Sequence, residues 1–290
     1  MSKSKTLQEL NLIDSFLFSA STENPEDAEL IARIIIERTI GKRVKDISVI
    51  PEKTLVGINT SYHGIRMDLY IMEYEDDEIK CVYDIEPNKY GIKELPVRSR
   101  FSQVLTDSKL LRPSRKYEKI PEYISIWILT DDPFGDDRMV YTVKNTVEEN
   151  PQIVYNDGVR RIFLYTSGKI GGTEVLRNLL NYFVKSDENN IADSDIRQLH
   201  TIVEKVKHSP EVGETYMTLQ EMIDYEKDES YSQGVSDGIS QGISQEISHG
   251  IETLVRICRS HNISDEQIVY NIAREYGITA EEAENYLKSN

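Results

Sequence analysis

Two apolar runs separated by a short acidic segment constrain the fold of this chain most strongly. The runs span Ile65–Met72 and Ile79–Ile85, and the turn-like segment Tyr74–Glu78 lies between them. Their composition predicts two adjacent strands of one sheet. Asp68 lies within the first run and Glu86 at the end of the second, so paired strands would bring both carboxylates to one edge of the sheet. Burying an unpaired carboxylate is costly, and a shared divalent metal would offset that cost.

Other β-forming segments extend this pair into a larger sheet. Tyr123–Thr130 is apolar on both faces, which predicts a central strand. Upstream, the segments on either side of Pro51 predict strands that join the first pair in an antiparallel meander. The remaining predicted strands are Val44–Ile50, Thr54–Ile58, Tyr62–Tyr70, Met139–Val143 and Arg161–Tyr165.

Helices are predicted before and after these strands. Asn24 caps a helix that has Pro25 in its first turn and ends at Gly41. Val97–Leu111 predicts a second helix and Thr173–Phe183 a third, both from their apolar periodicity. These segments flank the predicted strands, so we expect an α/β fold with helices packed on a sheet.

The composition changes after Lys185, where core packing is expected to end. The low-complexity segment Ser230–Gly250 places glycine, and also valine or isoleucine, on a four-residue grid. Because a helix has 3.6 residues per turn, this stripe winds around the axis by about 40° per step. We interpret the segment as a self-association or linker helix. The other predicted helices are Ile191–Val206, Tyr216–Tyr225, Asp265–Tyr276 and Ala280–Leu287, with Gly277 ending the third and Thr279 and Glu282 capping the fourth.

These shifts predict three regions. Residues 1–185 form the sheet-containing domain, residues 186–229 a helical extension, and residues 230–290 the glycine and isoleucine repeat helix with the C-terminal helices. We expect the last region to act as an oligomerisation arm, so the chain is predicted to form a homo-oligomer through its C-terminal helices.

Composition excludes several classes of protein. The 290 residues include only Cys81 and Cys258, in no CxxC pattern, which argues against a disulfide scaffold or a thiolate zinc site. The first twenty residues lack the apolar core of a secretory signal. No apolar run approaches the roughly 20 residues that span a bilayer. We therefore expect a soluble cytoplasmic protein with no membrane partner.

The charge of the chain is unevenly distributed. The net charge is −16, yet Ile40–Ile120 holds 15 Lys and Arg against 13 Asp and Glu, so the acidic excess lies elsewhere. Basic residues are densest directly after the paired acids. Both a solvated helix face and a phosphate-binding surface fit this pattern. The basic residues are Lys93, Arg98, Arg100, Lys109, Arg112, Arg115, Lys116 and Lys119, against Glu94, Asp107 and Glu118.

Several familiar chemical motifs are absent from the sequence. Ser167-Gly168-Lys169 lacks the upstream glycines of a phosphate-binding loop, and no GxGxxG or GxSxG occurs. The five histidines are scattered, without metal-ligand spacing. Asp131-Asp132 precedes Pro133, which favours a turn over a metal site. Asp68 and Glu86 remain as the leading candidates for a chemical site.

Four short motifs taken in order carry a resemblance to a known family. They are Arg66-Met67-Asp68-Leu69-Tyr70, Tyr83-Asp84-Ile85-Glu86-Pro87-Asn88, Glu94-Leu95-Pro96-Val97-Arg98-Ser99-Arg100 and Asp132-Pro133-Phe134-Gly135. This arrangement resembles the PD-(D/E)XK nuclease superfamily, and more narrowly its Rpn group, the recombination-promoting nucleases also described as PD-(D/E)XK family transposases. The similarity covers nearly the full chain. A glycine-spaced helix near the C-terminus is also common in this group.

The resemblance implies a fold, a cofactor and a reaction. The fold would be a restriction-endonuclease-like core, a central mixed sheet flanked by helices, with a helical C-terminal extension. Asp68 and Glu86 would bind Mg²⁺ or Mn²⁺, with the backbone carbonyl of Pro87 as a further ligand. The reaction would be metal-dependent hydrolysis of DNA with low sequence specificity, in a recombination or mobile-element context.

The resemblance also implies roles for neighbouring residues. Asn88 occupies the position where the superfamily usually has Lys and the Rpn group often Gln, and would assist catalysis. Glu29 would be the acid that a helix contributes to many of these nucleases. The expected nucleic-acid contacts are Arg98, Arg100, Lys89 and Gln103.

Alternatives to this assignment stay open. Asp68 could be an edge-strand acid paired with Arg66, and Glu86 a strand-end acid before a proline turn. Asn88 and the acidic net charge favour a non-catalytic DNA- or protein-binding assembly module that keeps the nuclease fold. In a third hypothesis the glycine and isoleucine helix is itself the functional part.

Overall fold

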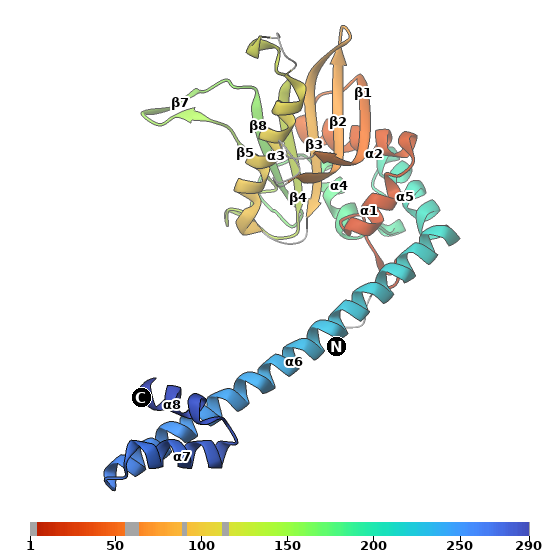
Figure 1. Ribbon diagram of the computed structural model, residues 1–290. Helices are drawn as coiled ribbons and strands as arrows, with labels where there is room; N and C mark the ends of the chain where they lie inside the picture. Colours follow the sequence, from red (N-terminus) through yellow and green to blue (C-terminus); the bar gives the residue numbers. More distant parts are fainter. Residues whose placement is uncertain (1–4, 56–63, 89–91, 112–115, 290) are drawn as a thin grey trace. The chain divides into compact units, whose positions relative to one another are not determined.

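The computed structural model describes residues 5–55, 64–88, 92–111 and 116–289 (Figure 1). The chain forms two compact units, Met1–Met217 and Thr218–Asn290. In the first unit a six-stranded mixed sheet has the order β1-β2-β3-β4-β8-β5. β1, β2 and β3 run antiparallel, β3, β4 and β8 run parallel, and β5 is antiparallel to β8. The strands are β1 (Asp46–Leu55), β2 (Ile65–Glu75), β3 (Glu78–Asn88), β4 (Glu122–Leu129), β5 (Val140–Val143) and β8 (Val159–Tyr165).

The strand pair predicted from the two apolar runs is confirmed as the hairpin β2–β3. Its ladder pairs Leu69 with Ile85 and Tyr70 with Asp84. The turn lies at Asp76 and Asp77, whose φ values are 51° and 62°. Positive φ at both central residues is typical of the tight turn whose twist matches a hairpin, and Asp tolerates it better than most residues.

β1 differs from its prediction in one respect. The segments before and after Pro51 form one strand rather than two, with Glu52 at φ 50°. β1 lies at the edge of the sheet, where a residue without an N–H is tolerated in a strand. Residues 56–58, the end of the predicted second strand, and residues 62–63, the predicted start of β2, lie outside the described residues.

β4 is the central strand that its sequence predicts. It lies between β3 and β8, and its side chains are buried from Tyr123 to Leu129. Ile124, Ile126 and Ile128 join one hydrophobic cluster, whereas Tyr123 and Trp127 join clusters on the opposite face. Burial on both faces explains why this run is almost continuously apolar.

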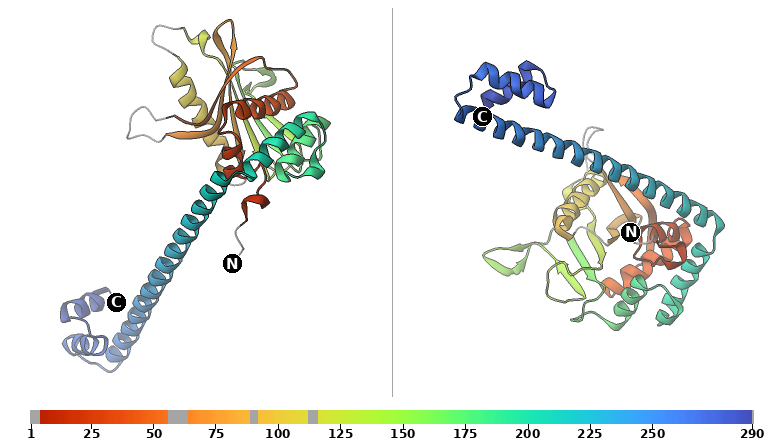
Figure 2. Two further views of the ribbon diagram at one scale, coloured as in Figure 1. Left: turned by 90° about the vertical axis from the view of Figure 1, so that its right-hand side faces the viewer. Right: turned by 90° about the horizontal axis from the view of Figure 1, so that it is seen from below.

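Helices cover both faces of the sheet (Figure 1 and Figure 2). One face packs against four helices through a single large core cluster, and the other is covered by α3. The central mixed sheet with flanking helices therefore agrees with the predicted α/β class. The helices are α1 (Ser15–Ser21), α2 (Pro25–Ile40), α4 (Glu174–Val184) and α5 (Ser194–Lys207) on the first face, and α3 (Leu95–Leu110) on the second.

The ends of α2 follow the sequence signals. The Asn24 side chain accepts hydrogen bonds from the backbone N–H groups of Glu26 and Asp27, and Pro25 begins the helix. Gly41 ends it at φ 70°, a conformation in which glycine has no steric penalty. The predicted start and stop are both confirmed.

The core extends further along the chain than predicted. Leu199 and Val203 of α5 are buried in the same cluster as the sheet, and Tyr216 also joins it. The prediction that core packing ends near Lys185 is wrong. The polar residues of α5 occupy only its outer face, and its apolar residues form a stripe on the inner face that packs into the core. Two short paired strands were not predicted from the sequence, β6 (Thr146–Val147) and β7 (Asn150–Val154). They form a separate two-stranded sheet (Figure 1).

A glycine in the first unit is required by close packing. A Cβ added at Gly168 would lie 2.5 Å from the backbone nitrogen of Met139, and a backbone atom cannot move aside as a side chain can. We expect Gly168→Ala to lower the free energy of unfolding by about 1–3 kcal/mol, measured by urea denaturation. The matched control is Gly213→Ala, because a Cβ there meets no atom within 4 Å. An equal loss in both variants would contradict the packing explanation.

The second unit is helical. α6 (Pro210–Ser260) spans the boundary between the units, and its C-terminal part packs with α7 (Asp265–Tyr276) and α8 (Ala280–Ser289). The predicted cap of α8 is confirmed, since Thr279 and Glu282 exchange side-chain and backbone hydrogen bonds. The low-complexity segment lies within α6 as one continuous helix. No helix among the described residues combines the length and the apolar character needed to cross a bilayer.

Candidate carboxylate site on the sheet

Asp68 and Glu86 lie opposite one another on the adjacent strands β2 and β3. Each is one step from the paired residues Leu69 and Ile85. The backbone N–H of Asp68 donates a hydrogen bond to Oε1 of Glu86 over 3.1 Å. The convergence of the two acids that the sequence predicts is therefore confirmed.

Burial raises the pKa of both carboxyl groups, so both are weaker acids than usual. Glu86 is 3% exposed. Its pKa is raised well above the ordinary value, first by loss of hydration and then by the negative charges of Asp84 and Asp68. Burial likewise raises the pKa of Asp68 to about 6, although the positive charge of Arg98 opposes this. The positive charge near these two carboxyl groups is therefore too small to offset the cost of ionising them.

Asp84 is a third acid that the sequence analysis did not select. It lies two positions before Glu86 on β3, so both side chains point to the face covered by α3. Its Oδ2 accepts hydrogen bonds from Ser102 Oγ at 2.7 Å and from Tyr123 Oη at 2.8 Å. Its Oδ1 is buried and has no hydrogen-bond partner among the described residues. The signal that could have revealed it is the alternation of acids, Asp84-Ile85-Glu86, directly after the apolar residues Cys81–Tyr83.

The hydroxyl of Tyr123 is one of the two donors that hold Asp84. We expect Tyr123→Phe to lower the free energy of unfolding by about 1–3 kcal/mol, because a buried carboxyl group loses one of its partners. Urea denaturation of the two proteins measures the difference. Tyr155→Phe, which alters a largely exposed ring, is the control and should leave stability unchanged. A neutral effect of Tyr123→Phe would show that this hydrogen bond contributes little.

Arg98 supplies positive charge to the site from the first turns of α3. Its Nη2 lies 3.3 Å from Oε2 of Glu86, and its guanidinium lies over the Trp127 ring, 5.3 Å from the ring centroid. The ring and the carboxylate together orient the guanidinium. Arg98 is nevertheless partly open to solvent, so one face can contact a ligand.

A pocket of about 920 Å³ adjoins the two acids through Arg98, which lines it and contacts Glu86. Neither acid is among its described lining residues. Arg98 and Arg100, two of the predicted nucleic-acid contacts, both line it. Arg66 of β2 lines it too, and this residue forms an ion pair with Glu52 rather than with Asp68. The alternative in which Asp68 is neutralised by a direct Arg66 ion pair is therefore not what the structure shows.

Two other predicted residues lie apart from the acids. Glu29 of α2 pairs with Arg33 over 2.8 Å, and α2 packs on the sheet face opposite to α3. The structure does not bring Glu29 to Asp68 and Glu86, because the acids point to the other face. Gln103 of α3 has both ends of its amide engaged, accepting from Arg161 and donating to Asp107.

The remaining predicted residues follow Glu86 along the chain. Pro87 is buried and paired with Ile128 of β4. Asn88 is the last residue of β3, and its side chain lies outside the described residues, as does Lys89 altogether. The roles expected for these three stay predictions. Asp132, by contrast, forms the turn predicted for it, accepting hydrogen bonds from the backbone N–H groups of Phe134 and Gly135.

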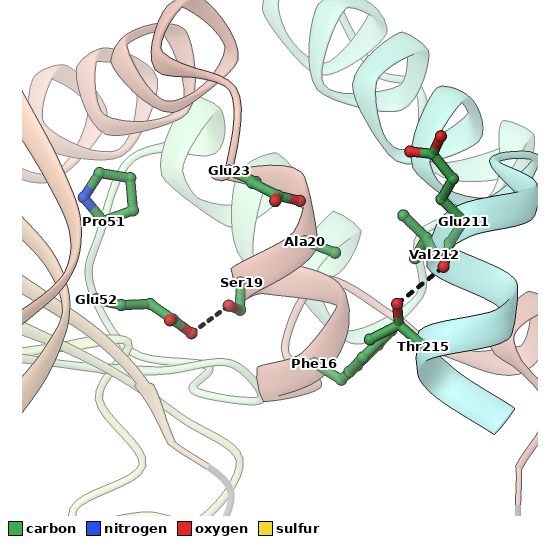
Figure 3. Close-up of a pocket in the computed structure, with 9 residues that line it drawn as sticks. All are labelled: Phe16, Ser19, Ala20, Glu23, Pro51, Glu52, Glu211, Val212 and Thr215. Atoms are coloured by element: carbon green, nitrogen blue, oxygen red, sulfur yellow. Dashed lines mark hydrogen bonds between the residues drawn. The ribbon is translucent and has the colours of Figure 1, made fainter. Parts of the chain in front are cut away.

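A second pocket of about 590 Å³ lies elsewhere in the first unit (Figure 3). It is bordered by α1, β1 and the start of α6, and contains none of the predicted site residues. Ser19 donates a hydrogen bond to Glu52 at its edge, and the Thr215 hydroxyl donates to the backbone carbonyl of Glu211. Its charged lining residues are all acidic, Glu23, Glu52 and Glu211, whereas the charged residues that line the pocket next to Asp68 are mainly basic.

Asp68 and Glu86 are the residues that could hold a divalent cation, which would complete its coordination with other oxygens. Among the described residues, no three His, Cys, Asp or Glu side chains gather as a metal site. Mg²⁺ is commonly held by only one or two carboxylates, together with water and substrate phosphates. A shortage of positive charge at this site fits the buried Glu86, the half-buried Asp68, an unpartnered Asp84 oxygen and the raised pKa values.

Comparison of the chain with protein-family models, curated proteins and solved structures found no match in any of the three.

Proposed function

We propose that this chain is a metal-dependent DNA endonuclease that hydrolyses phosphodiester bonds with low sequence specificity, in a recombination or mobile-element context. The observation that carries the proposal is the meeting of Asp68 and Glu86 on adjacent strands beside a basic pocket. In this proposal the first unit has the restriction-endonuclease-like core of the PD-(D/E)XK superfamily and its Rpn group. The order of the sequence motifs supports that assignment.

The proposed cofactor is Mg²⁺ or Mn²⁺, held by Asp68 and Glu86, with the Pro87 carbonyl as a further ligand. When bound, such a cation lowers the pKa of a water molecule and offsets charge on the phosphate. The two acids would then be fully ionised, because the cation favours their charged forms.

Other residues of the chain would position the substrate. Arg98 contacts Glu86 and also lines the pocket, so it is placed to hold a phosphate oxygen next to the acids. Arg100 adds a second charge on the same pocket wall. We assign Asn88, two positions after Glu86, to orienting water or a phosphate oxygen. An amide can do this by hydrogen bonding, although it carries no charge.

The test is cleavage of plasmid DNA by the purified full-length chain. We expect conversion of supercoiled to nicked or linear DNA with Mg²⁺ or Mn²⁺, and none with excess EDTA. Cleavage that persists in EDTA would contradict the metal dependence. The absence of any cleavage with either metal would favour the alternative, a non-catalytic binding module.

A separate hypothesis, self-association through α6, is favoured by the exposed apolar residues of that helix. Val235 and Ile239 lie in solvent four residues apart, and a Cβ added at Gly234 or Gly238 meets no atom within 4 Å. Open glycines would permit close approach of the same helix from a second copy. Light scattering of the full chain should give the mass of an oligomer, and Val235→Glu with Ile239→Glu should reduce it. An unchanged mass would count against this arm.

A further inference from the structure

The helix α3 buries three hydroxyl side chains and exposes two valines. Its buried residues are Leu95, Ser99, Ser102, Leu105 and Thr106, and Ser102 donates a hydrogen bond to Asp84 of the sheet. Val97 and Val104 are instead 58% and 55% exposed. A helix on a protein surface normally presents polar residues to water. Val97 and Val104 therefore give the otherwise polar outer face of α3 an apolar part that a ligand can cover.

The exposed valines belong to one stripe that lines the pocket beside the acids. Val97, Arg100, Phe101 and Val104 follow helical spacing and all line it. The opposite wall comes from the start of β2, which contributes Ile65. Apolar side chains therefore lie on both sides of a cavity of about 920 Å³, within the roughly 300–1,000 Å³ typical of ligand pockets.

The same pocket is strongly cationic. Among the described residues that line it, Arg66, Lys93, Arg98 and Arg100 stand against one acid, Glu94. Arg66 is paired with Glu52, which does not line the pocket. Arg98 also contacts Glu86, so the cationic wall continues to the proposed reaction site. A ligand that fits must carry negative charge next to the acids and an apolar, flat or compact group against the valines.

An unpaired nucleotide has this combination of groups. Its phosphate suits the arginines, and its base has an apolar face that packs on apolar or aromatic side chains. In an intact duplex the base faces are stacked on one another, and only phosphates and groove edges are accessible. We infer that the pocket takes an unpaired nucleotide beside the scissile phosphate, so that single-stranded DNA binds in preference to duplex. This inference rests on the proposed function and names the substrate class of that site.

The experiment measures binding without cleavage. The full-length chain in EDTA is titrated into fluorescein-labelled oligothymidylate, and separately into a mixed-sequence duplex of equal length, with fluorescence anisotropy as the readout. We expect the single strand to bind at least about tenfold more tightly at equal salt concentration, because stacking adds to the phosphate contacts. The double variant Val97→Ser, Val104→Ser keeps the charge and alters only exposed side chains. It should lose about fivefold or more in single-strand affinity and keep its duplex affinity.

The binding experiment has its own control variant and its own contradicting outcomes, which do not depend on DNA cleavage. Val175→Ser changes an exposed valine on α4 and should bind both probes as the unaltered chain does. Equal affinity for the two probes, or an unchanged single-strand affinity in the double variant, would overturn the inference. Tighter binding of oligouridylate than of oligothymidylate would overturn its assignment to DNA. DNA cleavage by a chain that does not prefer single strands would overturn the inference and leave the proposed function standing. A preference for single strands without cleavage would overturn the proposed function and leave the binding inference standing.

Discussion

Asp68→Asn and Glu86→Gln are each expected to reduce Mg²⁺-dependent DNA cleavage by more than about 100-fold. Loss of residues that merely support metal ligands already costs about 10- to 100-fold, and these substitutions remove proposed ligands themselves. Both replacements keep the size of the side chain, so the hairpin β2–β3 should remain folded. The rate of plasmid nicking at saturating Mg²⁺ measures the effect.

The control for these variants replaces an acid that has no proposed role in the site. Glu118→Gln alters an exposed residue of the short helix Tyr117–Lys119 and should cleave normally. Circular dichroism should give the same spectrum for every variant as for the original chain, which checks that each is folded. Robust cleavage by Asp68→Asn would show that the reaction, if present, occurs elsewhere on the chain.

The same substitutions should stabilise the metal-free protein near pH 8. The folded chain holds the pKa of Asp68 at about 6, against 3.8 ordinarily, so the folded state binds a proton more readily than the unfolded state. Its stability therefore falls as pH rises from about 4 through about 6, and the whole penalty is present above that range. Removing the charge should raise the free energy of unfolding by about 1–2 kcal/mol, after allowance for partial solvent screening. Glu86→Gln should act in the same direction, since burial raises the pKa of Glu86 as well.

Urea denaturation in EDTA at pH 8 and at pH 4 measures this gain. The gain should be present at pH 8 and vanish at pH 4, where the Asp68 carboxyl is largely protonated in the folded state. A variant less stable than the original chain at pH 8 would contradict the view that these acids are held at an energetic cost. Loss of activity together with a gain of stability would identify a functional site rather than a structural ion pair.

Local sequence signals predicted much of the fold. The caps of α2 and α8, the hairpin β2–β3 and the central strand β4 each follow from residues adjacent in sequence, whose conformational preferences act over a few positions. The meeting of Asp68 and Glu86 followed as well, because antiparallel pairing across a short turn fixes which residues face each other.

Features that depend on distant contacts were not predictable in this way. Asp84 is held by Ser102 and Tyr123, which come from α3 and β4, so no short motif reveals its environment. The outer side of α2, which carries Glu29, could be placed only once the sheet face that α2 covers was known. The end of the core was missed because α5 joins it through contacts with segments far back in the chain.

The most direct test of the central claim is calorimetric titration of the full-length chain with Mg²⁺ and Mn²⁺. The proposed site predicts saturable binding at pH 8 that is lost in Glu86→Gln, retained in Glu118→Gln, and weaker at pH 5 because the carboxyl groups must first release protons. Equal binding by the original chain and Glu86→Gln, or no binding by the original chain at pH 8, would contradict a metal site formed by Asp68 and Glu86.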